Sequence, residues 1–152
     1  MRTYILLVVV LILAVGLTAC GGGGGAQQQP APAAGQAPAV KGNPEKGKQL
    51  FAQTVLAGNA GCITCHSLEP GKVLVGPSMA GIASRAGNTV PGQSAEEYLR
   101  ISIVDTNAYL AKGCNVNAPE EPCAANLMPA DWAQKLTPEQ IDDLVAYLLT
   151  LK

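Results

Sequence analysis

The sequence predicts an all-α domain in which three to five helices are joined by long loops. Three segments carry helix start signals followed by apolar residues at helical spacing. The segments between them, residues 67–93 and 106–135, are rich in glycine and proline, which favour turns over regular structure. No segment alternates apolar and polar residues over the length of an ordinary strand, and no internal repeat is present.

The first predicted helix covers residues 44–57. Asn43 is a suitable N-cap and Pro44 suits the first helical position, where no N–H is needed. The apolar residues near helical spacing within it are Leu50, Phe51 and Val55. A Gly-Asn-Ala-Gly segment, residues 58–61, is predicted to end this helix.

The second and third helices each begin with a predicted capping box, Ser94 with Glu97 and Thr137 with Gln140. The second continues with an apolar stripe of Tyr98, Leu99, Ser102 and Ile103. In the third, Leu136 and Ile141 are placed for a hydrophobic staple, and apolar residues continue at Leu144, Val145, Leu148 and Leu149.

The N-terminal part of the chain is typical of an export signal followed by a linker. A short basic start and an apolar run up to Leu17 predict a signal peptide over residues 1–19. Its end, Leu-Thr-Ala-Cys, resembles the bacterial lipobox, which implies lipidation of Cys20. The alternative is an uncut N-terminal helix that remains in the membrane. Either form places the protein on the outer, periplasmic face of the bacterial cytoplasmic membrane.

Residues 20–42 are predicted to be a flexible tether, because their Gly, Gln, Ala and Pro composition has no hydrophobic period. The globular domain is therefore expected over residues 43–152. From Asn43 onward it has 8 Lys and Arg against 11 Asp and Glu, a net charge of −3. A mildly acidic domain lacks the basic patch that nucleic-acid binding requires.

The motif Cys62-Ile-Thr-Cys65-His66 is the attachment pattern of a c-type haem. Each thiol can add to a haem vinyl group, and the following histidine can reach the iron as proximal ligand. His66 is the only histidine, so one haem without bis-histidine ligation is expected. Two alternatives stay open: a zinc site completed by Cys114 and Cys123, and a redox-active dithiol. The domain has few aromatic residues, and a buried haem would enlarge its small hydrophobic core.

The predicted sixth ligand is Met128, followed by Pro129 on the loop before the third helix. A neutral thioether there would stabilise ferrous iron and raise the potential. Met79 lies only 13 residues after His66 and is predicted to line the haem pocket without binding iron.

From Gly47 to Leu148 the sequence resembles the class I c-type cytochromes. The motifs that carry the resemblance, in order, are Gly47-Lys-Gln-Leu-Phe51, the haem motif, Gly76-Pro77, Gly81, Arg85, Met128-Pro129 and Leu144-Val-Ala-Tyr-Leu148. The resemblance implies the class I cytochrome c fold, with Gly47 and Phe51 crossing the last helix at Leu144 and Tyr147. It further implies that the carbonyl of Pro77 accepts a hydrogen bond from His66. It also implies that Arg85 pairs with a haem propionate, and the alternative is that Arg85 is an ordinary surface charge. Trp132 and Tyr109 are expected near the haem.

The loop from Ala111 to Ala125 departs from the simplest members of this family. It carries Cys114 and Cys123, which we expect to form a disulfide in an oxidising compartment. Such a bond would stiffen the loop that leads to Met128.

We expect a membrane-tethered single-electron carrier with no small-molecule substrate, because both axial positions would be filled by the protein. Its partners would be membrane-bound redox complexes or other cytochromes in a respiratory or photosynthetic chain. The cysteine followed by polyglycine is similar to lipoproteins of filamentous green phototrophs. That similarity implies a subunit of a quinol-oxidising complex such as alternative complex III, with a free tethered shuttle as its equal alternative. A peroxidase-like enzyme with a labile sixth ligand is the alternative of another class.

Overall fold

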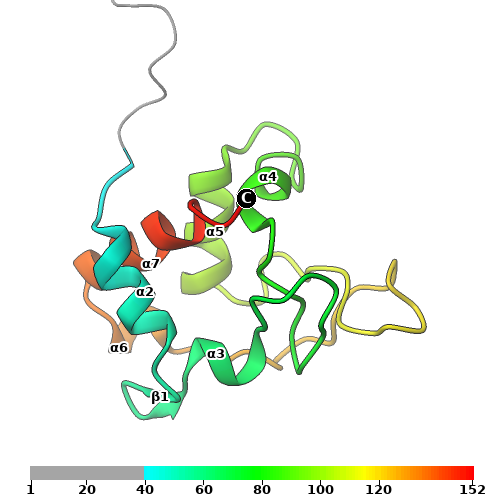
Figure 1. The fold of residues 1–152 in the computed structure, drawn as a ribbon, viewed down its shortest axis with the longest axis horizontal. Coiled ribbons are helices and arrows are strands. Elements are labelled where there is room, and N and C mark those ends of the chain that lie inside the picture. The colour runs from blue at the N-terminus through cyan, green and yellow to red at the C-terminus, as the bar shows by residue number, and fades with distance from the viewer. Residues whose placement is uncertain (1–39) are drawn as a thin grey trace, which may run out of the picture. The chain divides into compact units, whose positions relative to one another are not determined.

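The computed structural model describes residues 40–152, and Figure 1 shows their arrangement. The predicted signal peptide, Cys20 and nearly all of the predicted tether lie outside the described residues. Among the helices of residues 40–152, none is long and apolar enough to cross a membrane.

Helices are the main regular elements of the described chain, as the sequence predicts. Its elements in chain order are α2 (Pro44–Phe51), β1 (Val55–Leu56), β2 (Asn59–Ala60), α3 (Cys62–Cys65), α4 (Ile82–Ala86), α5 (Ala95–Val104), α6 (Trp132–Lys135) and α7 (Pro138–Leu148). The two strands form one small antiparallel hairpin. The remaining described residues form the long loops that join these short elements.

The first helix is shorter than the sequence predicts. It begins as expected, because the Asn43 side chain accepts hydrogen bonds from the backbone N–H groups of Glu45 and Lys46. It ends at Phe51 rather than at residue 57. Residues 55–60 instead form the β1–β2 hairpin, whose turn holds Ala57 and Gly58 at positive φ. Helical φ is negative, so these two residues cannot continue α2. The prediction that Val55 belongs to a helix was therefore wrong, and each strand of the hairpin has only two residues.

The capping signals correctly locate α5 and α7. Ser94 Oγ accepts a hydrogen bond from the backbone N–H of Glu97, one half of the predicted box. The box at α7 is complete: Thr137 Oγ1 accepts from the N–H of Gln140, whose side chain accepts from the N–H of Thr137. Each bond satisfies an N–H that has no partner inside the helix.

Helices α2 and α7 cross at Gly47, although nearly one hundred residues separate them in sequence. A Cβ built on Gly47 would lie 1.9 Å from the carbonyl oxygen of Asp143, so only glycine permits this approach. Beside the crossing, the rings of Phe51 and Tyr147 have centroids 5.5 Å apart. The buried carboxylate of Asp143 accepts a hydrogen bond of 2.6 Å from the backbone N–H of Asn43. This contact fastens the start of the domain to its last helix.

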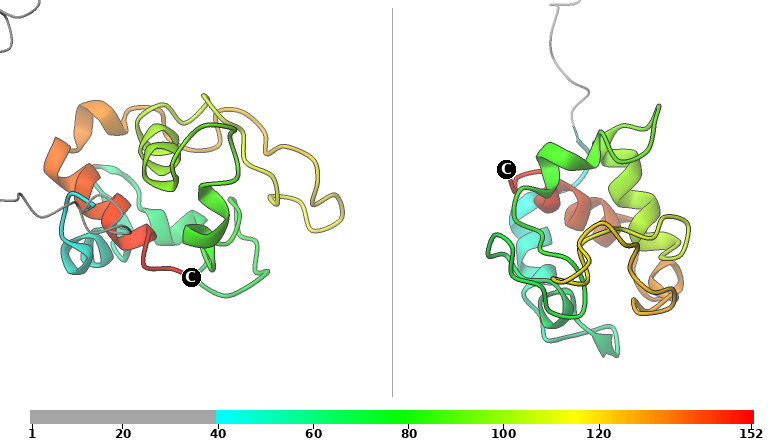
Figure 2. Two further views of the ribbon diagram at one scale, coloured as in Figure 1. Left: turned by 90° about the horizontal axis from the view of Figure 1, so that it is seen from above. Right: turned by 90° about the vertical axis from the view of Figure 1, so that its right-hand side faces the viewer.

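The loop between α5 and α6 contains the largest stretch of irregular structure in the described chain. Figure 2 shows it, in yellow, extending beyond the helices. Within it, Cys114 and Cys123 form a disulfide with a Cα–Cα distance of 5.3 Å. The backbone N–H of Cys123 also donates to the carbonyl of Ala111 over 2.7 Å. These bonds close the loop at its base.

Candidate haem site

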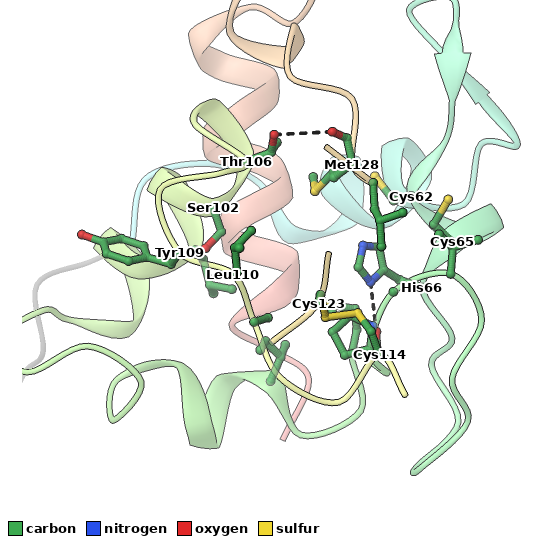
Figure 3. Close-up of a pocket in the computed structure, with 18 of the residues that line it drawn as sticks. Cys62, Cys65, His66, Ser102, Thr106, Tyr109, Leu110, Cys114, Cys123 and Met128 are labelled. Atoms are coloured by element: carbon green, nitrogen blue, oxygen red, sulfur yellow. Dashed lines mark hydrogen bonds between the residues drawn. A yellow bond between two sulfur atoms is a disulfide. The ribbon is translucent and has the colours of Figure 1, made fainter. Parts of the chain in front are cut away.

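A cavity of about 770 Å³ lies between the haem motif, α4, α5 and the loop that precedes α6 (Figure 3). Its volume falls in the range of about 300–1,000 Å³ found for small-molecule and cofactor sites. The wall contains the haem motif residues and both candidate methionines: Cys62, Cys65, His66, Met79 and Met128.

The haem motif is held by a single helical turn, α3. Thr64 Oγ1 donates to the carbonyl of Gly61 over 2.6 Å, and the N–H of His66 donates to the carbonyl of Cys62. Both thiols are free and partly buried. Burial raises the pKa of the Cys62 thiol to about 11, so it is protonated at neutral pH.

His66 is oriented by the backbone of Pro77. Its Nδ1 lies 2.9 Å from the Pro77 carbonyl oxygen, an acceptor, so Nδ1 carries the proton and donates. Nε2 is then the nitrogen left available for a metal. Burial lowers the pKa of His66, partly opposed by the Pro77 carbonyl, and so favours the neutral imidazole that a metal requires.

Gly76 makes room for the histidine ring. A Cβ at Gly76 would lie 2.4 Å from Cε1 and 2.8 Å from Nδ1 of His66. The N–H of Gly76 donates to the carbonyl of Cys65 over 2.9 Å, which holds this segment against the haem motif. Sequence reasoning gave Gly76 no role of its own, although a glycine directly before Pro77 is a signal of tight backbone packing.

Met128 is positioned by a pair of asparagines that sequence reasoning missed. Asn126 adopts a positive φ of 63° and its backbone N–H donates to Asn107 Oδ1 over 2.9 Å. Asn107 Nδ2 returns a bond of 3.1 Å to Asn126 Oδ1. This pair joins the loop before Met128 to the residues that follow α5. Met79 also lines the cavity and packs against the core.

Arg85 lies in the cavity wall at the end of α4. Its guanidinium donates to the backbone carbonyls of Ser78 and Ala80. Burial lowers the pKa of Arg85, which remains a cation at neutral pH. The structure thus places Arg85 beside the cavity, and its pairing with a propionate stays a prediction.

Polar atoms in the wall fit a cofactor that carries polar substituents. Ser102 Oγ and Trp132 Nε1 are buried, line the cavity and have no hydrogen-bond partner within the described chain. Buried polar groups are costly without a partner, so a bound group is expected to reach them. Tyr109, also in the wall, accepts a hydrogen bond of 2.6 Å from Gln93 Nε2. An apolar cavity with two free thiols, a neutral imidazole and these polar atoms fits a covalent haem.

The disulfide occupies the two cysteines that the zinc alternative requires. With Cys114 bonded to Cys123, neither thiol is available to complete a site with Cys62 and Cys65. Within residues 40–152, no group of three or more His, Cys, Asp or Glu is placed to hold a metal ion. The zinc alternative is therefore wrong.

Comparison with known proteins agrees with haem as the cofactor. The family model for cytochrome c matches residues 44–152. The chain is 33% identical to cytochrome c2 of Rhodopila globiformis over 119 residues, covering 78% of this chain and all of that protein. It is 30% identical to cytochrome c2 of Rhodopseudomonas palustris, covering 70% and 96% of the two chains. No solved structure matches the chain. This chain belongs to the class I c-type cytochromes, carries one covalently bound haem c, and is an electron-transfer protein rather than an enzyme.

Proposed function

We propose that this cytochrome carries single electrons through a haem with His66 and Met128 as its axial ligands, while tethered to a membrane by lipidated Cys20. The observation that carries the ligand assignment is that His66, oriented through Nδ1, and Met128 line the same cavity as the two free thiols. The haem, when bound, supplies an iron that accepts and returns one electron.

Residues of the chain would attach the haem and position its two ligands. Cys62 and Cys65 would hold the haem covalently through thioether bonds, and Pro77 fixes the ring plane of His66 through Nδ1. Met128 would fill the remaining axial position and leave no open position for a substrate. The asparagine pair, Asn107 and Asn126, holds the backbone of the Met128 loop.

The ligand assignment is tested by replacing each methionine in the mature holoprotein. Met128→Ala should open an axial position, so the reduced protein should bind carbon monoxide rapidly and lose the spectrum of thioether ligation. Met79→Leu is the matched control, since it lines the same cavity, and should leave both properties unchanged. Carbon monoxide binding in Met79→Leu together with an unchanged Met128→Ala protein would contradict the assignment.

The tether places the electron carrier on the periplasmic face of the cytoplasmic membrane. Residues 21–42, treated as a flexible coil, span about 25 Å, and the Ala/Pro half extends this reach. A tether of this length keeps the domain at a high effective concentration near membrane-bound redox complexes and other cytochromes. Intact mass tests this proposal: a mature chain that begins at diacylated Cys20 supports it, and retention of residues 1–19 contradicts it.

Two arrangements of the tethered protein are distinguishable by purification. A subunit of a quinol-oxidising complex such as alternative complex III would co-purify with that complex in mild detergent. A shuttle would be released as a monomer. The control is a chain whose residues 1–20 are replaced by a cleavable signal peptide without a lipobox, because it should leave the membrane as a shuttle yet remain with a complex held by protein contacts.

A further inference from the structure

The position of Pro77 determines how His66 is oriented, because the Pro77 carbonyl accepts the hydrogen bond of 2.9 Å from His66 Nδ1. Pro77 lies in irregular chain between α3 and α4 and has no backbone N–H of its own. The neighbouring Gly76 donates to the carbonyl of Cys65, which holds this segment against the haem motif. The proline ring itself can be held only by packing.

Gly113, in the long loop between α5 and α6, faces this proline ring. A Cβ built on Gly113 would lie 3.7 Å from Cβ of Pro77, which is an ordinary contact distance. Apart from its chain neighbours, no other atom of the described residues lies within 4 Å of that Cβ. Gly113 also has a positive φ of 87°, a conformation that glycine adopts readily. The outward side of its backbone is therefore turned toward Pro77 alone.

Bonds on both sides of Gly113 hold it in this position. Before it, Lys112 forms an isolated antiparallel bridge with Pro122, and after it Cys114 is bonded to Cys123. We call residues 111–114 and 122–123, which these bonds join, the disulfide clasp. A backbone fixed on both sides cannot move away from Pro77 unless the clasp opens.

The disulfide clasp and the proximal histidine belong to the same wall of the haem cavity. Cys114, Cys123 and Pro77 all line it, and Figure 3 draws the disulfide beside the hydrogen bond of His66. A hydrogen bond to the second nitrogen of a ligand histidine fixes the ring plane and makes the ligand more basic. Whatever restrains Pro77 therefore acts on the iron through His66.

We propose that the disulfide clasp positions the proximal ligand: through Gly113 it holds Pro77 in place and so maintains the hydrogen bond to His66 Nδ1. The proposal rests on His66 as an iron ligand, which is part of the function proposed above. It gives the disulfide a role on the proximal side, in addition to the loop that leads to Met128. A firm bond at Nδ1 makes Nε2 a stronger electron donor, which favours ferric iron. Loss of the contact between Gly113 and Pro77 should therefore raise the reduction potential.

The NMR signal of the His66 Nδ1 proton in the reduced, mature holoprotein reports on this hydrogen bond. A water-soluble phosphine reduces the disulfide to two thiols and becomes the phosphine oxide, while the iron stays ferrous. We expect the Nδ1 proton to shift upfield and to exchange with solvent at least about tenfold faster, and re-forming the disulfide should restore both. The amide signals of Gly47 and Tyr147, at the crossing of α2 and α7, should not move. An unchanged Nδ1 signal, or a change that these two amides share, would overturn the proposal.

Gly113→Ala tests the same contact with the disulfide intact, which protects the test if the opened protein unfolds. Alanine is strained at a φ of 87°, so the backbone should shift at this position. The Nδ1 proton should then move upfield and the reduction potential should rise. Val116→Ala is the matched control, because Val116 lies between the two cysteines, is 68% exposed and is outside the clasp. The proposal fails if Gly113→Ala keeps the wild-type signal, or if both variants change it equally.

The competing explanation is that the clasp acts only through the loop that leads to Met128. Asn107→Ala breaks the asparagine pair that holds this loop, so it should shift the methyl signal of Met128 and leave the His66 Nδ1 signal in place. A His66 shift in Asn107→Ala as large as the shift on opening the disulfide would refute a proximal role. Failure of the ligand assignment itself is distinguishable, because the Nδ1 proton of the untreated wild type would then lack the ring-current shift of a haem ligand.

Discussion

The crossing of α2 and α7 predicts that Gly47→Ala destabilises the domain strongly. The added Cβ would lie 1.9 Å from the carbonyl oxygen of Asp143, and real contacts begin near 3.0 Å, so the helices must separate by about 1.1 Å. Overpacking of this kind costs about 1–3 kcal/mol. A gap of this size also weakens the packing of Phe51 on Tyr147 by about 1 kcal/mol or more.

One effect acts in the opposite direction. Alanine favours a helix over glycine by about 0.5–1 kcal/mol, so the net loss should be about 2 kcal/mol. Denaturant unfolding of the holoprotein, followed by tryptophan fluorescence, measures the free energy of unfolding, and Tm should fall by about 10 °C. The control is Lys48→Ala, an exposed neighbour in α2, which should stay within about 0.5 kcal/mol. A Gly47→Ala protein as stable as the wild type would refute the close crossing.

Three further predictions concern the loops. Replacing Cys114 and Cys123 by serine should lower the free energy of unfolding by about 3 kcal/mol, because the disulfide closes a loop across a sequence separation of 9. An unfolding midpoint that the replacement leaves unchanged would contradict this prediction. Gly76→Ala should displace the ring of His66, lower the free energy of unfolding by about 1–3 kcal/mol and alter the absorption spectrum. An unaltered spectrum and an unaltered stability would argue against the close contact between Gly76 and this ring. Hydrogen bonding to Lys135 holds the pKa of Asp131 in the folded protein below its usual value of 3.8. The contact therefore stabilises the fold fully above pH 3.8, and this stabilisation is lost as the pH falls through the lower pKa of the folded state. NMR titration should show the depressed pKa, and Lys135→Ala should raise it.

Features that depend on neighbouring residues were predictable from the sequence. The caps of α2, α5 and α7 were located correctly because a cap is formed within four residues, between a side chain and a nearby N–H. The Thr137 box is an example in which both bonds are made. The haem motif is equally local, since its chemistry is set by the spacing of two cysteines and a histidine.

Features that depend on distant contacts were not predictable. The hairpin at Val55–Ala60 has strands of two residues, too short for any alternation to appear in the sequence. Asn107 and Asn126 are 19 positions apart in the sequence, on either side of the loop that the disulfide closes. Gly76 has a role only because the ring of His66 folds back against it.

The contact of α2 with α7 also affects the order in which the molecule is made. Synthesis runs from the N-terminus, so α2 and the haem motif exist long before Asp143 and its helix. The hydrogen bond from Asn43 to Asp143 spans 100 positions of the chain and cannot form until the last helix is complete. Contacts this distant in sequence form slowly. The contact that joins the two ends of the domain is therefore among the last that the growing chain can make.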